Sequence, residues 1–224
     1  MIGTPRVHLR VADSTNERAR ELALGGAPHG ALVTADEQTA GRGRQGRAWT
    51  AAPRSALLMS LVVRDFTPML PLAAAVAVCD AIAPLEARIK WPNDVWIDER
   101  KVAGILVEGR PQEGWAVLGI GLNVTTREFP EELREIATSL AVAGSDATTE
   151  EVLAALLPAL DRRLADDPAD VLAAWRERDA LLGRRVRWQD GEGIAAGVSD
   201  SGSLLVDTSS GRLTLGAGEI HLLR

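Results

Sequence analysis

The chain has 224 residues, an apolar fraction of 46% and a formal net charge of −6. This apolar fraction excludes a wholly disordered chain, and the length fits one large domain or an ordinary domain with a small addition. The acidic balance argues against a protein that binds a long polyanion, since such binding needs an extended basic face. Basic side chains that act on a ligand must therefore be concentrated locally.

The cysteine content and the N-terminal segment indicate where the protein works. The single cysteine, Cys79, lies in the apolar run LAAAVAVCDAI, where a buried and inert thiol is expected. One cysteine cannot form a disulfide within the chain, which fits a reducing compartment. The first seventeen residues, MIGTPRVHLRVADSTNE, contain no apolar stretch long enough for a signal peptide or a membrane span. We therefore expect a cytoplasmic protein with no membrane association.

The first elements are a helix and a strand. Ser14 and Glu17 have capping-box spacing, and the helical pattern that follows them ends at Gly25. Residues 30–38, GALVTADEQ, have the composition of a strand. This strand leads directly into an arginine-rich loop.

The middle of the chain predicts a sheet with helices packed on it. Residues 55–64 are predicted to be a buried strand and residues 71–85 an apolar helix. Residues 87–124 contain short apolar runs with tight connections, which indicates an antiparallel meander. Residues 149–165 and 168–182 have helical periodicity with acidic first turns. These two helices would cover the sheet.

Beyond Gly183 the pattern changes to short β runs separated by DG, DSG, SSG and GAG turns. About forty residues of such hairpins suggest a small SH3-like barrel. We therefore expect two domains, at residues 1–182 and 183–224.

The loop at residues 41–49, GRGRQGRAW, holds three arginines and three glycines. Such a segment can be a disordered tether, a solvated turn or a loop that closes over phosphate. It occurs once, between two predicted core strands, where long irregular loops are usually functional. Arginines offer forked donors to phosphate or carboxylate, and Trp49 offers a face to a planar base. No Walker motif is present.

Two lysines stand out because every other basic residue in the set of 25 is arginine. Lys90 begins the segment KWPND, in which Pro92-Asn93-Asp94 is favourable turn chemistry. Lys101 precedes the apolar run VAGILV, so its ammonium can point at a ligand or extend into water. We hypothesise that guanidinium cannot replace ammonium at these two positions.

The segment VLGIGLNV resembles the start of a dinucleotide fingerprint but lacks the third glycine and a following helix. In a strand, Gly119 and Gly121 would clear one face for a ligand or a close backbone, and Asn123 would project from that face. The three histidines have no metal-ligand spacing, so we expect no metal site made by the protein.

Taken together, these motifs resemble one family, the biotin protein ligases, along essentially the whole chain. The matching segments, in the family's order, are STN at 14–16, EQTAGRGRQGRAW at 37–49, KWPND at 90–94, KVAGILVE at 101–108, GIGLN at 119–123 and the C-terminal GEIHLLR. The resemblance implies an α+β fold: a mixed, largely antiparallel sheet with flanking helices, followed by the SH3-like barrel. Because STN begins at Ser14, no N-terminal DNA-binding domain and no repressor function are expected.

The resemblance also implies an activity and the residues that carry it. Biotin would be activated with ATP to biotinyl-5′-AMP and transferred to a lysine of a biotin carboxyl carrier protein, with Mg²⁺ accompanying the nucleotide. The implied biotin-binding residues are Ser14, Thr15, Asn16, Gln38, Gly41, Arg42, Gly43, Arg44, Lys101, Gly119 and Gly121. The implied adenylate-binding residues are Arg44, Arg47, Trp49, Asn93, Lys101, Asn123 and Arg224. The implied catalytic residues are Lys101, Arg42, Arg44, Arg47 and Asp94.

In the resemblance, residues 44–49 form a mobile lid that folds over the reactive adenylate and shields it from water. The sequence departs from the family at Gln45, where many members have another arginine, and at Leu223, which occupies the strict position of a nucleotide-binding arginine. Relatives include monomers and homodimers, and we expect one of these two states.

Two alternatives remain open. A lipoate or octanoate ligase or transferase shares the catalytic fold, although the RGRQGR run and the SH3-like tail favour biotin. A non-enzymatic protein, either an RNA binder or a biotin-sensing paralogue, is disfavoured by the net acidity and by the presence of Lys101.

Overall fold

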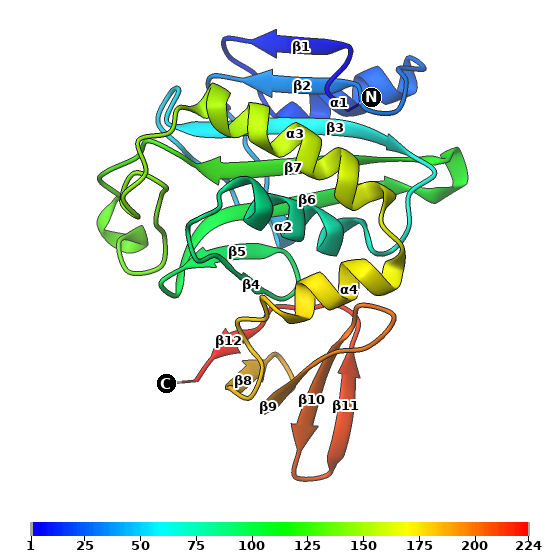
Figure 1. Cartoon of the computed structure of the whole chain (residues 1–224), viewed down its shortest axis with the longest axis vertical. Coiled ribbons are helices and arrows are strands. Elements are labelled where there is room, and N and C mark those ends of the chain that lie inside the picture. The colour runs from blue at the N-terminus through cyan, green and yellow to red at the C-terminus, as the bar shows by residue number, and fades with distance from the viewer. Residues whose placement is uncertain (1, 224) are drawn as a thin grey trace.

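A mixed seven-stranded sheet forms the centre of the structure, a computed structural model in which residues 2–223 are described (Figure 1). The strand order is β1-β2-β3-β7-β6-β5-β4. Only β1 and β2 run parallel, and the remaining neighbours are antiparallel. The strands are β1 (Arg6–Leu9), β2 (Leu32–Ala35), β3 (Ala56–Arg64), β4 (Arg88–Lys90), β5 (Asp94–Ile97), β6 (Arg100–Arg110) and β7 (Trp115–Asn123). The predicted meander is therefore confirmed as β4-β5-β6-β7.

Helices cover both faces of this sheet, which explains why β2 and β3 are apolar almost throughout. On one face lies α1 (Thr15–Leu24), whose alanines pack on β2, β3 and β7. On the other face lie α2 (Leu70–Ala81), α3 (Thr149–Ala165) and α4 (Pro168–Arg176) (Figure 1). Because successive strand residues face opposite sides, each buried strand needs apolar residues at every position.

The helix ends show where sequence patterns succeed and fail. Helix α3 begins with a complete capping box, since Thr148 and Glu151 each bond the other's backbone N–H. The capping box predicted at Ser14 is wrong: Ser14 is the N-cap, but its side chain makes no capping bond and Glu17 instead pairs with arginines. The predicted helices over 71–85 and 168–182 also end earlier, at Ala81 and Arg176.

A second, five-stranded antiparallel sheet follows the helices, in the order β11-β10-β9-β8-β12. Its strands are β8 (Arg185–Trp188), β9 (Gly191–Val198), β10 (Leu204–Thr208), β11 (Gly211–Leu215) and β12 (His221–Leu222). Within residues 2–223 no ladder joins β11 to β12, so the sheet does not close into a barrel. The α+β fold class is confirmed.

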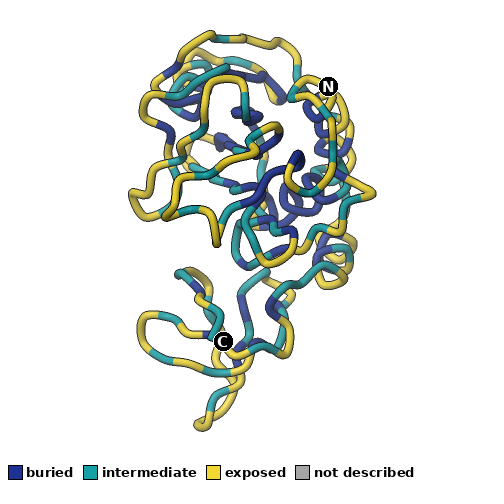
Figure 2. Tube along the Cα trace, turned by 90° about the vertical axis from the view of Figure 1, so that its left-hand side faces the viewer, coloured by how far each residue is buried: buried dark blue, intermediate teal, exposed yellow. Residues whose placement is uncertain are grey.

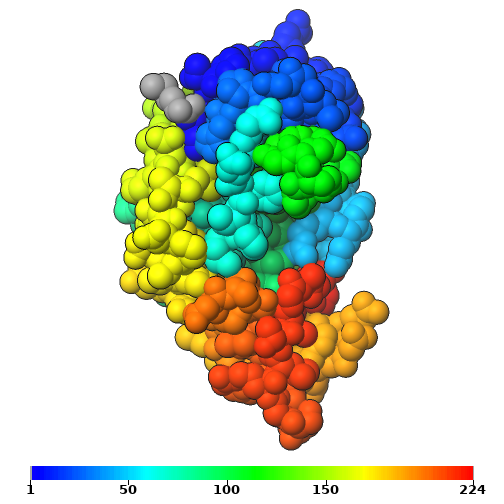
Figure 3. All heavy atoms as spheres, turned by 90° about the vertical axis from the view of Figure 1, so that its right-hand side faces the viewer, coloured from blue at the N-terminus to red at the C-terminus, as the bar shows by residue number. Residues whose placement is uncertain are grey.

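The two sheets share one hydrophobic core. Val186, Val206 and Ile220 of the second sheet belong to the same buried cluster as the interior of the first. Trp91, beside β4, donates from its indole nitrogen to the carbonyl oxygen of Gly202 at 3.0 Å. The smaller part tapers below the main body, and its outer hairpin is largely exposed (Figures 2 and 3). Packing and hydrogen bonding therefore fix the second sheet against the lower edge of the first.

Candidate functional site

The site lies where α1 stops covering its face of the sheet. Val62 of β3 and Val117 of β7 are buried under α1. Beyond the end of α1, the same face presents Ser60 of β3 and, opposite it, Gly119 of β7. Gly121 of β7 follows on this face. These small side chains leave a hollow beside the first turn of α1. Small residues at these positions are thus the reason that a cavity exists there.

This hollow is a cavity of about 140 Å³, which we call the amide cavity because the side-chain amides of Asn16 and Gln38 contribute to its wall. It is bounded by the start of α1, the loop at 41–49, the ends of β4 to β7 and the segment 218–220 of the smaller sheet. Its lining includes Ser14, Thr15, Asn16, Gln38, Arg42, Gly43, Arg44, Arg47, Trp49, Lys90, Asn93, Asp94, Lys101, Gly119, Gly121 and Glu219.

A buried hydrogen-bond network forms one wall of the amide cavity. The Oε1 atom of Gln38 accepts from the backbone N–H of Thr15 at 2.7 Å and lies 3.0 Å from the Thr15 hydroxyl. The Ser60 hydroxyl lies 2.8 Å from that of Thr15 and 2.6 Å from Oδ1 of Asn16. Asn16 Nδ2 donates to Glu108 at 2.7 Å, which fixes the amide orientation.

The hydrogen-bond network in this wall has too few hydroxyl protons. Three oxygen–oxygen contacts link Gln38, Thr15, Ser60 and Asn16, but only two hydroxyl protons are available to fill them. The wall therefore has more acceptors than donors. A ligand with N–H groups would supply what is missing.

Glycines in the sheet make room for neighbouring side chains. A Cβ on Gly119 would collide with the Asn16 amide, and one on Gly121 would lie 2.5 Å from the indole of Trp49. A Cβ on Gly104 would lie 3.0 Å from the end of the Lys101 side chain. Gly119 and Gly121 thus clear a face as predicted, but the groups placed directly against them are Asn16 and Trp49.

The loop at 41–49 is a short hairpin that covers the cavity. Trp49 N–H donates to the Gly41 carbonyl at 3.0 Å, and Gly43 N–H donates to the Arg47 carbonyl at 2.7 Å. Gln45 at its tip has φ = 55°, a left-handed conformation that glutamine adopts at some cost. These two backbone hydrogen bonds hold the loop in its hairpin conformation.

Each arginine of the loop has a partner on a different element. Arg42 pairs with Glu17 of α1 at 3.1 Å, and Arg44 donates to Oδ1 of Asn93 at 3.2 Å. Burial lowers the pKa of Arg44, and the nearby charge of Arg47 adds to this effect while that of Asp94 opposes it.

Arg47 makes an ion pair with Glu219, which precedes β12 in the smaller sheet. The smaller sheet therefore supplies an anchor for the loop.

A second cavity of about 500 Å³ adjoins the first, and we call it the aromatic cavity. Trp49, Lys90, Asp94 and Lys101 line both cavities. The aromatic cavity is further lined by Trp96, Asn123, Phe129, Leu133, Ile136, His221 and Leu222, among others. Its apolar and aromatic walls suit a flat ring system.

Lys101 marks the junction of the two cavities. Its ammonium lies 2.7 Å from the Asp94 carboxylate and 5.6 Å from the centroid of the Trp49 ring. The Trp49 indole nitrogen is buried without an acceptor among residues 2–223. An unpaired buried N–H is costly, so an acceptor on a bound ligand would relieve it.

The structure brings most of the predicted site residues to one place, with three exceptions. Gly41 begins the loop but lines neither cavity, and a Cβ there would collide with the carbonyl oxygen of Trp49. Asn123 lines the aromatic cavity but not the amide cavity, and its side-chain amide donates to the Thr138 carbonyl at 3.0 Å. Arg224 lies outside the described residues.

Sequence reasoning singled out Lys90 but gave it no role in binding or catalysis, and it missed Ser60, Glu108 and Glu219. A serine in the otherwise apolar strand SALLMSLVVR was a usable signal for Ser60. The aromatic cavity's outer wall, which includes Phe129 and Ile136, also went unrecognised because residues 125–140 are mostly irregular.

Other kinds of site find little support. The described part of the chain, residues 2–223, contains no group of three His, Cys, Asp or Glu side chains placed to hold a metal ion. Over the same range, none of the helices combines the length and apolar character needed to cross a bilayer.

The fold and the two joined cavities under a basic loop define a site of the kind that accommodates small anionic ligands. The chain belongs to the biotin/lipoate A/B protein ligase family, whose model matches residues 8–124. Residues 181–223 match the biotin protein ligase C-terminal domain. The prediction of a ligase of this family is therefore confirmed.

Individual relatives agree with this assignment. The bifunctional ligase/repressor BirA of Bacillus subtilis is 36% identical and is aligned over 99% of this chain and 75% of its own length. The biotin–[acetyl-CoA-carboxylase] ligase of Mycobacterium tuberculosis is 38% identical over 94% of this chain and 86% of its own. The biotin protein ligase of Aquifex aeolicus, solved with biotin and ATP, superposes with a TM-score of 0.86 at 31% identity and covers 99% of both chains.

Proposed function

We propose that this protein activates biotin with ATP, forming biotinyl-5′-AMP and pyrophosphate, and then transfers the biotinyl group to a lysine of a biotin carboxyl carrier protein. The observation that carries the proposal is the junction at Lys101, where an acceptor-rich cavity meets an aromatic one beneath three arginines. A biotin ligase of Aquifex aeolicus with the same fold was solved with both biotin and ATP.

Biotin fits the amide cavity by its hydrogen-bonding pattern. Its cyclic urea carries two N–H donors, and the wall formed by Gln38, Thr15, Ser60 and Asn16 has a surplus of acceptors. Lipoate and octanoate have no urea and would leave those acceptors unfilled. The unfilled acceptors favour biotin over the two related acids.

The nucleotide fits the aromatic cavity, with its α-phosphate directed at Lys101. The purine can pack against Trp49 and Phe129, and the unpaired Trp49 N–H can donate to a phosphate oxygen or to the base. Mg²⁺ would arrive with the phosphates, because the nearby protein carboxylates are few.

The first step brings together two anions, so its rate depends on positive charge. A carboxylate oxygen of biotin attacks the α-phosphorus, and the bond from that phosphorus to the bridging oxygen breaks. Lys101 and Arg44 lie where negative charge builds up between the reactants, and their fixed positions lower the barrier. The loop at 41–49 acts as a lid that keeps water from the adenylate.

In the second step the neutral amine of the carrier's lysine attacks the acyl carbon, and AMP leaves. Asp94 faces both cavities and is held by Lys101, so it is placed to orient that amine. The division into domains at residue 182, the cytoplasmic location and the monomeric or dimeric state stay as further proposals. We include no repressor function, since a net charge of −6 opposes an extended DNA-binding face.

Purified protein incubated with biotin, ATP and Mg²⁺ should release pyrophosphate only when biotin is present. Addition of a carrier domain should then increase its mass by one biotinyl group. Lipoate and octanoate serve as competing substrates; turnover with either, but not with biotin, would refute the substrate assignment. Absence of turnover with all three acids would favour a binding protein.

A further inference from the structure

Lys90 is one of the two lysines of the chain, and the proposed function has not yet used it. It ends β4 and lies opposite Asp94 in the β4–β5 hairpin. Its side chain is half-buried and lines both the amide and the aromatic cavity. Lys101 is the other lysine at this junction, so all the lysines of the chain meet at one place.

Within residues 2–223 the ammonium of Lys90 has no carboxylate partner, unlike the neighbouring cations Lys101 and Arg47. Lys101 is paired with Asp94 and Arg47 with Glu219. Among the residues that the structure describes, 2–223, no carboxylate lies within 4.0 Å of the Lys90 ammonium. Instead the ammonium lies 4.9 Å from the centroid of the Trp96 ring, a cation–π contact that holds it in place.

Positive charge at this end of the junction is therefore in excess. Burial lowers the pKa of Lys90, and the nearby charges of Lys101 and Arg47 lower it further against the opposing effect of Asp94. The same field extends to the mouth of the aromatic cavity, where burial, Lys90 and Arg47 lower the pKa of His221. A half-buried, unpaired cation in such a field is stabilised by a polyanionic ligand.

We propose that Lys90 binds the β- and γ-phosphates of ATP and holds the pyrophosphate as it leaves. This inference rests on the proposed function, because the reaction supplies the polyphosphate. When the bond from the α-phosphorus to the bridging oxygen breaks, the electron pair stays on the pyrophosphate, and the negative charge on that group increases. Lys90 stabilises this charge without transferring a proton.

A compact ammonium suits this role better than a guanidinium. The Trp96 face occupies one side of the Lys90 ammonium, and the pyrophosphate must approach from the cavity side. The lysine ammonium, a compact charge with three donors, can bind the pyrophosphate in the remaining space. The planar guanidinium of an arginine would stack on the indole and turn its donors away.

The test compares the two half-reactions in Lys90→Met, which keeps the length and the contact with Trp96 but removes the charge. Biotin-dependent exchange between pyrophosphate and ATP should fall at least tenfold, with a higher KM for ATP and an unchanged KM for biotin. Transfer of biotin from synthetic biotinyl-5′-AMP to the carrier should be unchanged, because the adenylate has no β- or γ-phosphate. Lys90→Arg should recover only part of the exchange activity.

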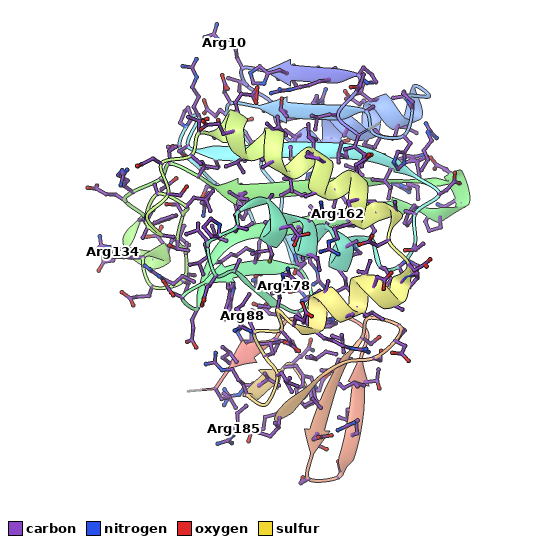
Figure 4. The ribbon with its side chains drawn as sticks, in the orientation of Figure 1. Arg10, Arg88, Arg134, Arg162, Arg178 and Arg185 are labelled. Atoms are coloured by element: carbon purple, nitrogen blue, oxygen red, sulfur yellow. The ribbon has the colours of Figure 1, made fainter. Side chains whose placement is uncertain are left out.

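A binding measurement separates this inference from the proposed function. Calorimetry with inorganic pyrophosphate should show weaker binding to Lys90→Met than to the wild type, even if turnover is absent from both. Arg88→Met is the matched control, since Arg88 lies two residues earlier in β4 and lines neither cavity (Figure 4). Equal losses in both half-reactions, or pyrophosphate binding unaffected in Lys90→Met, would overturn the assignment to the leaving group.

Discussion

A methyl group placed on Gly121 would lie 2.5 Å from Cε2 of Trp49, so the strand and the loop can meet only because this residue is glycine. The contact joins β7, in the middle of the sheet, to the end of the loop at 41–49. Trp49 forms the shared wall of the two cavities. The position of that wall is therefore set by one missing side chain.

Gly121→Ala should displace Trp49, because the indole must move away from the new methyl group. The binding of biotin and ATP should weaken by about tenfold as a result. Tryptophan fluorescence of the free protein should change as well. Gly25→Ala is the control, because at that position φ is −75° and the nearest atom would lie 3.4 Å from the new Cβ. Unchanged affinity and fluorescence in Gly121→Ala would contradict the tight contact.

Lys101→Arg should be nearly as inactive as Lys101→Met, with turnover reduced at least a hundredfold. The ammonium is bonded to Asp94 at 2.7 Å, and the adjacent backbone of Gly104 is so close that a Cβ there would lie 3.0 Å from the lysine terminus. A guanidinium is larger and its planar fork does not fit this space. Steady-state pyrophosphate release measures the effect.

The same two variants also reveal where Lys101 acts. Unlike Lys90→Met, both should impair transfer from synthetic biotinyl-5′-AMP, because in the proposed reaction Lys101 contacts the α-phosphate, which the adenylate retains. Activity of Lys101→Arg within a few-fold of the wild type would show that charge alone is sufficient.

Glu219→Gln should expose the loop at 41–49 to trypsin. The pair between Glu219 and Arg47 connects the smaller sheet to the loop, and at this largely exposed position it is worth about 0.5–1 kcal/mol. Cleavage after Arg47 should therefore become about two- to fivefold faster. Glu192→Gln, which alters an exposed pair within the smaller sheet, is the control.

Bound biotin and ATP should slow cleavage of the wild-type loop if it closes as a lid. Equal rates for the wild type and Glu219→Gln would show that the smaller sheet does not restrain the loop.

The sequence predicted the fold wherever one physical signal dominated. The helix at Thr149–Ala165 was predicted to the residue from its periodicity and acidic first turn, and the structure adds a true capping box between Thr148 and Glu151. At Ser14 the same pattern misled, since Glu17 is drawn to Arg42 across the site and tertiary ion pairing outweighs the local cap.

The site was predicted unevenly for a similar reason. Ser60 lies outside the recognised motifs, and Glu108 and Glu219 lie inside two of them but were given no role, because all three act through contacts between elements distant in the sequence. Such contacts depend on strand register, which a periodic pattern does not determine. The glycines showed that space was needed but not which side chain would fill it.

Asp80 should be a major determinant of stability, because three arginines converge on it. Arg162 and Arg163 of α3 and Arg178, just after α4, bond its carboxylate at 2.8–3.1 Å and so tie both helices to α2. Arg162 and Arg178 are labelled in Figure 4. Only 13% of the Asp80 side chain is exposed. Asp80→Asn should therefore lower the free energy of unfolding at pH 7 by about 2 kcal/mol.

The stabilisation by Asp80 should depend on pH. Burial raises the pKa of Asp80, but the hydrogen bonds and charges of the arginines outweigh this effect and hold the pKa below its ordinary value of 3.8. A carboxylate with a lowered folded-state pKa contributes stability above the ordinary value and loses it as the pH falls through the folded-state pKa. Denaturant unfolding should thus show a constant difference in the free energy of unfolding between the wild type and Asp80→Asn from pH 7 to about pH 5, and a shrinking difference below pH 3.8.

Asp200→Asn is the control, since Asp200 belongs to an exposed ion pair, and it should leave the free energy of unfolding within about 0.5 kcal/mol of the wild type. A gap for Asp80→Asn that persisted unchanged in acid would mean that the carboxylate charge is not what joins the helices.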